Sequence, residues 1–387
     1  MKITAVRTIV VGADMRNWVF VKIETDEGIV GWGESTVEWK TRAVVGCVED
    51  FAPFLIGEDP CRIEHLWQIM VRQLYFRPGM VECSAISGIE IACWDILGKS
   101  LGVPVYQLLG GAVRDELRLY DHLGGGEKDA LYESLEIDQV REHARASLNA
   151  GFDAIKLVTV VPRTARLDGH RVLAHADTIM GAVRDEVGDD VDVMVDMHGR
   201  ASPMMAAQYF KVLEPYRPWF FEEPCPPENP RMMAELARRT TVPIACGERL
   251  CTRHAFRDLL ELSAASVLQP DLVHCGGIAE GRRIAAMAEA YHAAVAPHAS
   301  TGPIGHAASV QLGFATPNVI IQETFRADVP WRFEILQQSL EIDRGRVKKP
   351  TAPGLGVEVD EAEAARHPFK QEPAMRYFND DGSVTDW

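Results

Sequence analysis

Apolar and polar residues follow two different patterns along the chain, and the change falls near residue 116. Before it, the run 18–23 is rich in β-branched and aromatic residues, 25–28 (TDEG) has turn composition, and 29–32 resumes the strand pattern. Two such runs around a short polar turn predict a β-hairpin. The segment 1–14 has a short apolar stretch without a cleavage pattern, so we expect a first strand rather than a signal peptide.

Helical spacing of apolar residues follows the hairpin. It predicts one helix over 60–75 and another over 86–99, after which the stretch 102–111 (GVPVYQLLGG) breaks the helical pattern. A hairpin followed by helices predicts an α+β unit over residues 1–115.

From residue 116 onward, short apolar strands alternate with helical stretches. Eight strands are predicted, over 117–122, 154–160, 193–198, 219–223, 243–248, 267–271, 294–298 and 319–323. Polar residues close the third to the eighth of them, at intervals of 23 to 27 residues, about the length of one strand–helix unit. Eight such units predict a parallel barrel over 116–335. The tail 336–387 leaves this pattern, and we expect it to return to the first unit.

Composition narrows the classes of function. The chain has 387 residues, which suits a barrel plus a second unit. Its net charge of −16 argues against a nucleic-acid partner, and no uncharged run approaches the ~20 residues of a membrane span. The eight cysteines contain no C-x-x-C pair, which favours reduced thiols in a cytoplasmic protein.

Titratable side chains gather at the predicted strand ends. Barrel enzymes carry their chemistry at the C-terminal ends of the strands. The residues there are Asp196, His198, Glu222, Glu248, Asp271, His298 and Glu323. A structural protein has no reason to place a titratable group on six consecutive strands, so the pattern predicts an active site.

Three of these acids suggest a metal site. Asp196, Glu222 and Glu248 end three consecutive predicted strands, so their side chains are expected to converge. Carboxylates without cysteine or histidine suit a hard cation; Mg²⁺ fits best, and Mn²⁺ is the alternative. Glu222 and Glu223 point to opposite sides of their strand, and spacing alone does not say which is the ligand.

The remaining residues suit acid–base chemistry. Asp196 and His198 are two apart on one predicted strand and are expected to face the same way. Asp271 and His298 end neighbouring strands, and a hydrogen bond between them would raise the basicity of the imidazole. His198 and His298 lie on opposite strands of an eight-membered ring, so one can take a proton and the other give one. Glu323 is left with two roles: donating to an oxyanion if protonated, or positioning the substrate.

These features resemble the enolase superfamily, in its mandelate racemase group, over nearly the whole chain. The hairpin 22–34 (KIETDEGIVGWGE), the segment 94–111, the strand ends and 353–357 (PGLGV) carry the resemblance. It implies a modified (β/α)7β TIM barrel with an α+β capping domain built from both termini. It also implies Mg²⁺ ligation by Asp196, Glu222 and Glu248.

The resemblance implies catalytic roles as well. His298, paired with Asp271, would be the general base, and Glu323 would contact the enediolate. The motifs 196–200 (DMHGR), 247–249 (GER) and 296–298 (APH) resemble the D-galactonate dehydratase family, whose histidine two residues after the first ligand protonates the departing 3-hydroxyl; His198 matches it. The expected activity is Mg²⁺-dependent dehydration of a sugar acid to a 2-keto-3-deoxy acid by a homo-oligomer.

Two alternatives stay open. Racemases of the group carry a K-x-K pair on the second barrel strand, but Lys156 is followed here by Val158, which argues against a two-base racemase. A racemase, epimerase or cycloisomerase remains the second hypothesis, and an inactive metal-binding relative the third. The identity of the sugar acid is open, as is substrate contact by Lys156 and by the loops 161–169 and 325–331.

Overall fold

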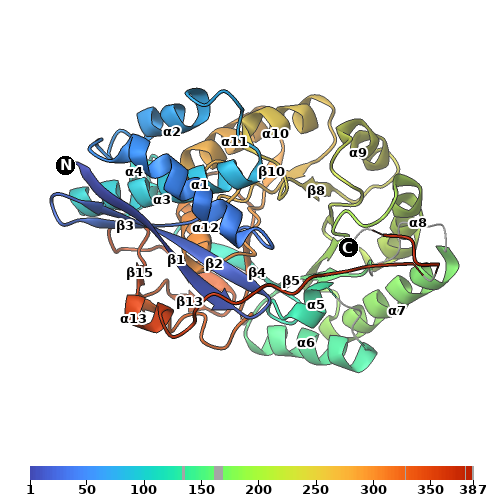
Figure 1. The fold of residues 1–387 in the computed structure, drawn as a ribbon. Helices are drawn as coiled ribbons and strands as arrows, with labels where there is room; N and C mark the ends of the chain where they lie inside the picture. Colours follow the sequence, from blue (N-terminus) through green and yellow to red (C-terminus); the bar gives the residue numbers. More distant parts are fainter. Residues whose placement is uncertain (133–135, 161–168, 327, 380, 386–387) are drawn as a thin grey trace.

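A computed structural model describes the whole chain except residues 133–135, 161–168, 327, 380 and 386–387. It shows an N-terminal α+β unit, the capping domain, packed beside a parallel barrel (Figure 1).

The capping domain is built on a three-stranded antiparallel sheet in the order β1-β2-β3. Its elements are β1 (Ile3–Ala13), β2 (Arg16–Thr25), β3 (Val30–Glu34), α1 (Thr41–Leu55), α2 (Ile63–Arg72), α3 (Met80–Leu101) and α4 (Val105–Leu108). The predicted hairpin is present, with Gly28 at φ 78° in its turn, a conformation that glycine tolerates best. Helix α1 is an addition to the predicted elements and keeps Pro53 in its last turn.

The barrel consists of eight parallel strands. They are β4 (Glu116–His122), β5 (Ala154–Val158), β6 (Asp192–Asp196), β7 (Phe221–Glu222), β8 (Ile244–Cys246), β9 (Val267–Leu268), β10 (Ala294–Val295) and β11 (Gln322–Thr324). Strands β4 to β10 neighbour one another in sequence order, and β11 closes the ring by pairing with β4. A bridge from Val295 to Val319 joins β10 to the residues before β11.

Helices cover the outside of the barrel. They are α5 (Lys128–Tyr132), α6 (Ile137–Asn149), α7 (Gly169–Val187), α8 (Pro203–Leu213), the short 3₁₀ helix η1 (Glu214–Tyr216), α9 (Pro230–Ala237), α10 (Thr252–Glu261), α11 (Ile278–Ala290) and α12 (Pro303–Ala315). A covering helix follows each of the first seven strands but not β11, so the predicted modified (β/α)7β barrel is confirmed. No helix in the described part of the chain is long and apolar enough to span a membrane.

Several strands end earlier than predicted. Glu248, Asp271 and His298 follow β8, β9 and β10 by two or three residues instead of closing them. The backbone turns away at these points, and His198 and Glu223, just after β6 and β7, have φ of 49° and 42°. The in–out alternation of a strand therefore stops before these residues, and other contacts must fix their directions.

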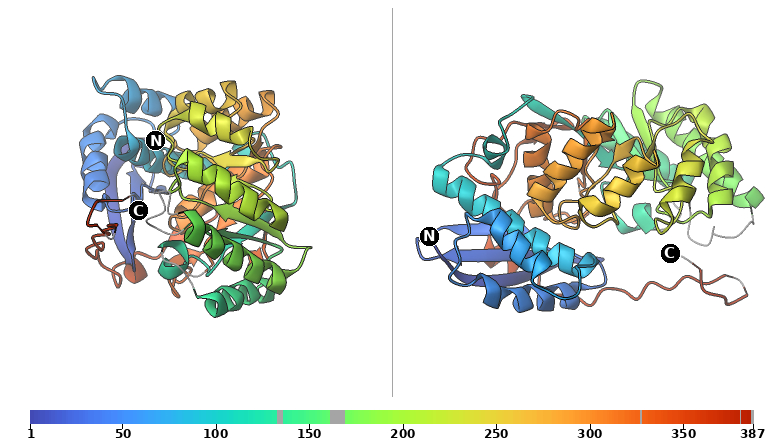
Figure 2. Two further views of the ribbon diagram at one scale, coloured as in Figure 1. Left: turned by 90° about the vertical axis from the view of Figure 1, so that its right-hand side faces the viewer. Right: turned by 90° about the horizontal axis from the view of Figure 1, so that it is seen from above.

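The tail contacts the barrel first and the capping domain afterwards. Its elements are β12 (Leu336–Gln338), β13 (Ile342–Asp343), β14 (Arg346–Lys348), β15 (Glu358–Val359) and α13 (Glu361–Ala364). Strand β14 pairs with barrel strand β4, whereas Gly354 bridges to Pro104 and Glu372 accepts from Trp39 N in the capping domain. Figure 2 shows the last described residues as an extended segment beyond this contact.

Candidate active site

The barrel interior explains why the polar side chains meet. One apolar residue from each strand region fills the centre: Tyr120, Ala154, Met194, Phe220, Ala245, Val267, Ala296 and Ile321. Two positions further along each segment come His122, Lys156, Asp196, Glu222, Gly247, Gln269, His298 and Glu323. On β4, β5 and β6, side chains two apart face the same way, so His122, Lys156 and Asp196 point inward and nearer to the mouth, whereas His298 lies beyond its strand and is placed by its contact with Asp271. The apolar layer thus supports a polar one.

Asp196, Glu222 and Glu248 come together in the structure. One carboxylate oxygen from each lies within 4.8 Å of the others. Lys156, which is 1% exposed, reaches the same point, with Nζ 2.6 Å from Glu222 Oε1 and 3.3 Å from Asp196 Oδ2. Burial lowers the pKa of Lys156, but Glu222, Glu323 and the other acids outweigh it and raise the pKa well above its ordinary value. One lysine therefore faces a surplus of buried negative charge.

The donor set fits a hard divalent cation. Glu248 Oε2 is buried and has no hydrogen-bond donor among the described residues, and His298 Nε2 lies 3.3 Å from it. Gln269 Nε2 donates to Glu222 Oε2 at 2.6 Å, which orients that carboxylate from outside. Three convergent carboxylates, one of which has an oxygen without a donor among the described residues, are what an oxygen-preferring ion such as Mg²⁺ requires.

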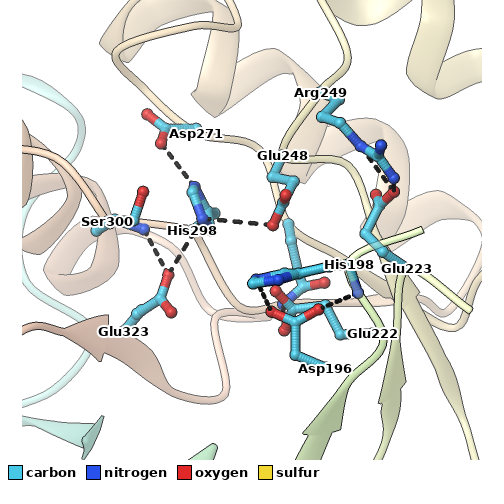
Figure 3. A network of polar contacts seen from close by, with 12 residues as sticks. Asp196, His198, Glu222, Glu223, Glu248, Arg249, Asp271, His298, Ser300 and Glu323 are labelled. Atoms are coloured by element: carbon cyan, nitrogen blue, oxygen red, sulfur yellow. Dashed lines mark hydrogen bonds and ion pairs between the residues drawn. The ribbon is translucent and has the colours of Figure 1, made fainter. Parts of the chain in front are cut away.

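His298 and Asp271 form a close pair (Figure 3). His298 Nδ1 lies 2.7 Å from Asp271 Oδ2, and Val273 N donates to the other oxygen of Asp271 at 2.7 Å. The carboxylate thus holds Nδ1 protonated and leaves Nε2 facing Glu248. Burial lowers the pKa of His298, but Glu248, Glu323 and Asp271 together raise it well above its usual value.

His198 reaches the site by a different route from the one predicted. It is not on strand β6, which ends at Asp196, but on the turn that follows. Its backbone N donates to Asp196 Oδ1 at 2.8 Å, and its Nε2 lies 3.2 Å from Asp196 Oδ2. The left-handed turn folds the imidazole back over the carboxylate, so the two residues are neighbours although strand alternation does not place them.

Glu323 is held as a carboxylate. It accepts from Ala299 N at 2.8 Å, and its other oxygen lies 2.7 Å from Lys156 Nζ. Burial raises its pKa, but Lys156 and His298 outweigh that effect and lower the pKa to about 2. Of the two roles that the sequence left open, positioning fits this ionised form.

Glu222 and Glu223 do point apart. Glu222 faces Lys156 inside the barrel, whereas Glu223 accepts from Gly247 N at 3.1 Å and pairs with Arg249 at 2.5 Å. Glu223 is therefore satisfied by the neighbouring strand region, and Glu222 is the acid that joins the triad.

The capping domain closes the site. A pocket of about 270 Å³ is lined from the barrel by Lys156, Glu248 and His298 and from the capping domain by Arg16 and Glu38. Arg16 is 2% exposed, pairs with Glu38 at 2.6 Å and donates to Ser300 O on the barrel side. The first residue of β2 and the segment after β3 thus form one wall of the pocket.

Sequence reasoning missed three polar residues of the inward layer. His122, Lys156 and Gln269 were not assigned roles, although each lies two residues after a residue of the apolar layer. Lys156 entered the sequence analysis only through the missing K-x-K pair and as an open substrate contact, and its strand was predicted to run to residue 160 whereas it ends at Val158. The sequence left open whether the loops 161–169 and 325–331 contact the substrate. Residues 161–168 and 327 lie outside the described residues, whereas Phe325 lines the pocket.

Fold and site together define a parallel barrel with three convergent carboxylates that could hold a metal ion, beneath a capping domain. Residues 3–110 match the N-terminal domain of mandelate racemase / muconate lactonizing enzyme, and residues 139–363 match the enolase C-terminal domain-like family. The chain belongs to the enolase superfamily, as its resemblance indicated.

Named relatives are similar over the full length. The chain is 42% identical to a D-galactonate dehydratase of Variovorax paradoxus (strain S110), with 100% of both chains covered. It is 41% identical to a D-galactonate dehydratase of Ralstonia pickettii (strain 12J), with 96% of each covered. A solved mandelate racemase/muconate lactonizing enzyme from Sulfitobacter sp. is 33% identical, has a TM-score of 0.90 and covers 100% of both chains.

Proposed function

We propose that this protein is a Mg²⁺-dependent sugar acid dehydratase and that D-galactonate is its substrate. One observation carries the proposal: two histidines from different strand regions lie beside different acids of the triad. His298 Nε2 lies 3.3 Å from Glu248 and His198 Nε2 lies 3.2 Å from Asp196. An acid and a base on separate sides of one carboxylate-binding centre suit elimination of a proton and a hydroxyl from adjacent carbons. The names of the two full-length relatives support D-galactonate.

The residues divide the reaction between them. His298, with Asp271 holding Nδ1–H, takes the C2 proton on Nε2. The electron pair left at C2 forms the C2=C3 double bond as the C3–O bond breaks, and His198 gives its proton to the departing oxygen, so that water leaves. The resulting enol becomes the 2-keto-3-deoxy acid. Positioned acid–base groups of this kind typically contribute about 10²- to 10⁴-fold each.

Asp196, Glu222 and Glu248 would hold the metal. When bound there, Mg²⁺ would supply positive charge to offset the charge that develops on the substrate carboxylate. By offsetting the charge of Glu248, it would also weaken the main cause that raises the pKa of His298. Lys156 and the ionised Glu323 complete the wall on the side of β5 and β11.

Turnover of a panel of aldonates and aldarates tests this function. We expect a 2-keto-3-deoxy product from D-galactonate that requires Mg²⁺ and is lost with EDTA and in His298→Asn. Glu289→Gln, on the exposed outer face of α11, is the control and should keep wild-type turnover. Incorporation of solvent deuterium at C2 without loss of the 3-hydroxyl would instead establish an isomerase. No product and no exchange with any acid would contradict both readings.

A further inference from the structure

His122 is a buried polar residue of the inward layer to which the proposed mechanism gives no role. It ends β4, and its Cα is the register partner of Lys156 on β5. It follows Tyr120 of the apolar layer by two residues, so its side chain projects to the same side, into the barrel. The residue is 1% exposed and lines the same pocket as Asp196, Glu248 and His298.

The hydrogen bonding of His122 fixes its tautomer. Nδ1 lies 3.2 Å from the carbonyl oxygen of Leu123, and a carbonyl only accepts, so Nδ1 carries the hydrogen. Nε2 is then a bare acceptor. Burial, and next the charge of Lys156, lower the pKa of His122 to about 3, so the ring stays uncharged.

Nε2 has no hydrogen-bond partner among the described residues. A buried acceptor left without a donor is costly, and such groups in native proteins call for an explanation. The Phe325 ring packs edge-on against the imidazole, with ring centroids 5.7 Å apart, and this limits reorientation of the ring. The missing partner must bring its own hydrogen, which excludes a carboxylate and favours a hydroxyl.

We propose that His122 Nε2 accepts a hydrogen bond from a chain hydroxyl of the bound sugar acid and so helps to select the substrate. The inference rests on the proposed function, because an aldonate supplies hydroxyls beyond C3 whereas a simple carboxylic acid does not. In the ring of strands, β4 lies opposite β8, which precedes Glu248. His122 would therefore contact the substrate from the side opposite Glu248.

Kinetics with D-galactonate and its analogues lacking the 4-, 5- or 6-hydroxyl test the inference. Wild-type kcat/KM should fall about tenfold with one of these analogues. His122→Phe should lose about tenfold on D-galactonate and nothing further on that same analogue, because the two changes remove the same hydrogen bond. A general structural defect would instead lower kcat/KM for all four substrates by the same factor.

His306→Phe is the matched control. His306 is also buried, at 5% exposed, with Nε2 unpartnered among the described residues and a pKa lowered by burial to about 3. It lies on α12 and not among the residues that line the pocket, so its replacement should leave the ranking of the four substrates unchanged. If His122→Phe does not fold, His122→Leu serves the same comparison.

The outcomes separate the two claims. A wild-type enzyme that turns over no aldonate overturns the proposed function, and this inference with it. If the wild type is active and the His122 variant ranks the analogues in the same order, only this inference is overturned.

Discussion

Two groups of buried carboxylates differ in how they are satisfied. At the barrel mouth, Asp196, Glu222 and Glu248 converge on one point, where side-chain cations face them. At the junction of the domains, Glu34 and Glu90 are each satisfied separately by backbone N–H groups at a helix N-terminus. The converging acids keep negative charge that a cation could neutralise, whereas each junction acid is already satisfied by its own hydrogen bonds.

The junction shows the capping in detail. Glu34 of the capping domain accepts from Gly302 N at 2.6 Å and Gly305 N at 2.8 Å at the start of α12. Glu90 accepts from Ile278 N and Ala279 N at 2.8 Å each at the start of α11. The first backbone N–H groups of a helix need acceptors, so these hydrogen bonds attach the capping domain to the barrel. The comparison predicts that mouth acids control activity and junction acids control stability.

The largest expected effect is at the mouth. Glu248→Gln should lower kcat/KM by about 10³-fold or more, because the metal loses a charged ligand. Without Mg²⁺ it should change the free energy of unfolding by less than about 1 kcal/mol, because the lost attraction to His298 is offset by relief of the repulsion between Glu248 and Glu222. Calorimetric titration with Mg²⁺ and urea unfolding would measure the two effects. Unchanged Mg²⁺ affinity would remove Glu248 from the metal site.

Lys156→Met should be the most destabilising of the changes at the mouth. Lys156 is the buried cation of the triad and Glu323, and removing it leaves those charges uncompensated, at a cost of about 3–5 kcal/mol. Mg²⁺ should then stabilise the variant more than it stabilises the wild type. Urea unfolding with and without Mg²⁺ checks this, and equal stability of the two proteins without metal would contradict it.

The junction predicts a pH dependence of stability. Burial raises the pKa of Glu90 to about 7, above its unfolded value of 4.5. Between these values the folded state binds the extra proton, so this group's contribution is full below pH 4.5 and falls as pH rises through 7, by about 1.4 kcal/mol per pH unit. Glu90→Gln should lose that slope and keep kcat/KM. Thermal unfolding of both proteins between pH 5 and 8 measures the difference, and parallel curves would contradict it.

The smallest expected effect comes from Trp94→Phe. It removes the indole N–H that donates to Glu90 Oε1 at 2.7 Å but leaves both backbone donors. We expect a loss of about 1–2 kcal/mol and a pH midpoint displaced upward, because that hydrogen bond lowers the pKa of Glu90. An unchanged midpoint in the same thermal series would show that the backbone donors alone set the pKa.

The two regions also differ in how far the sequence revealed them. The mouth acids recur at strand–helix intervals, so the period that predicts the barrel also identifies them. Glu34, Glu90 and Asp95 have no such period. Asp95, for example, accepts from Leu355 N, which is 260 residues away. A hydrogen bond to a segment far away in the sequence leaves no local signal, and none of the three was predicted.

The sequence by itself determined the parallel barrel, its capping domain and the acids and histidines at the strand ends, because strand alternation and the strand–helix repeat are local properties of the chain. The sequence also predicted that the three acids converge and that Asp271 pairs with His298, whereas other contacts were decided by tertiary structure alone. It turned His198 back onto Asp196 through a left-handed residue, brought Lys156 among the acids and left Nε2 of His122 without a partner among the described residues. These contacts depend on where the strands stop and on how the ring closes, and both are set by packing between residues far apart in sequence.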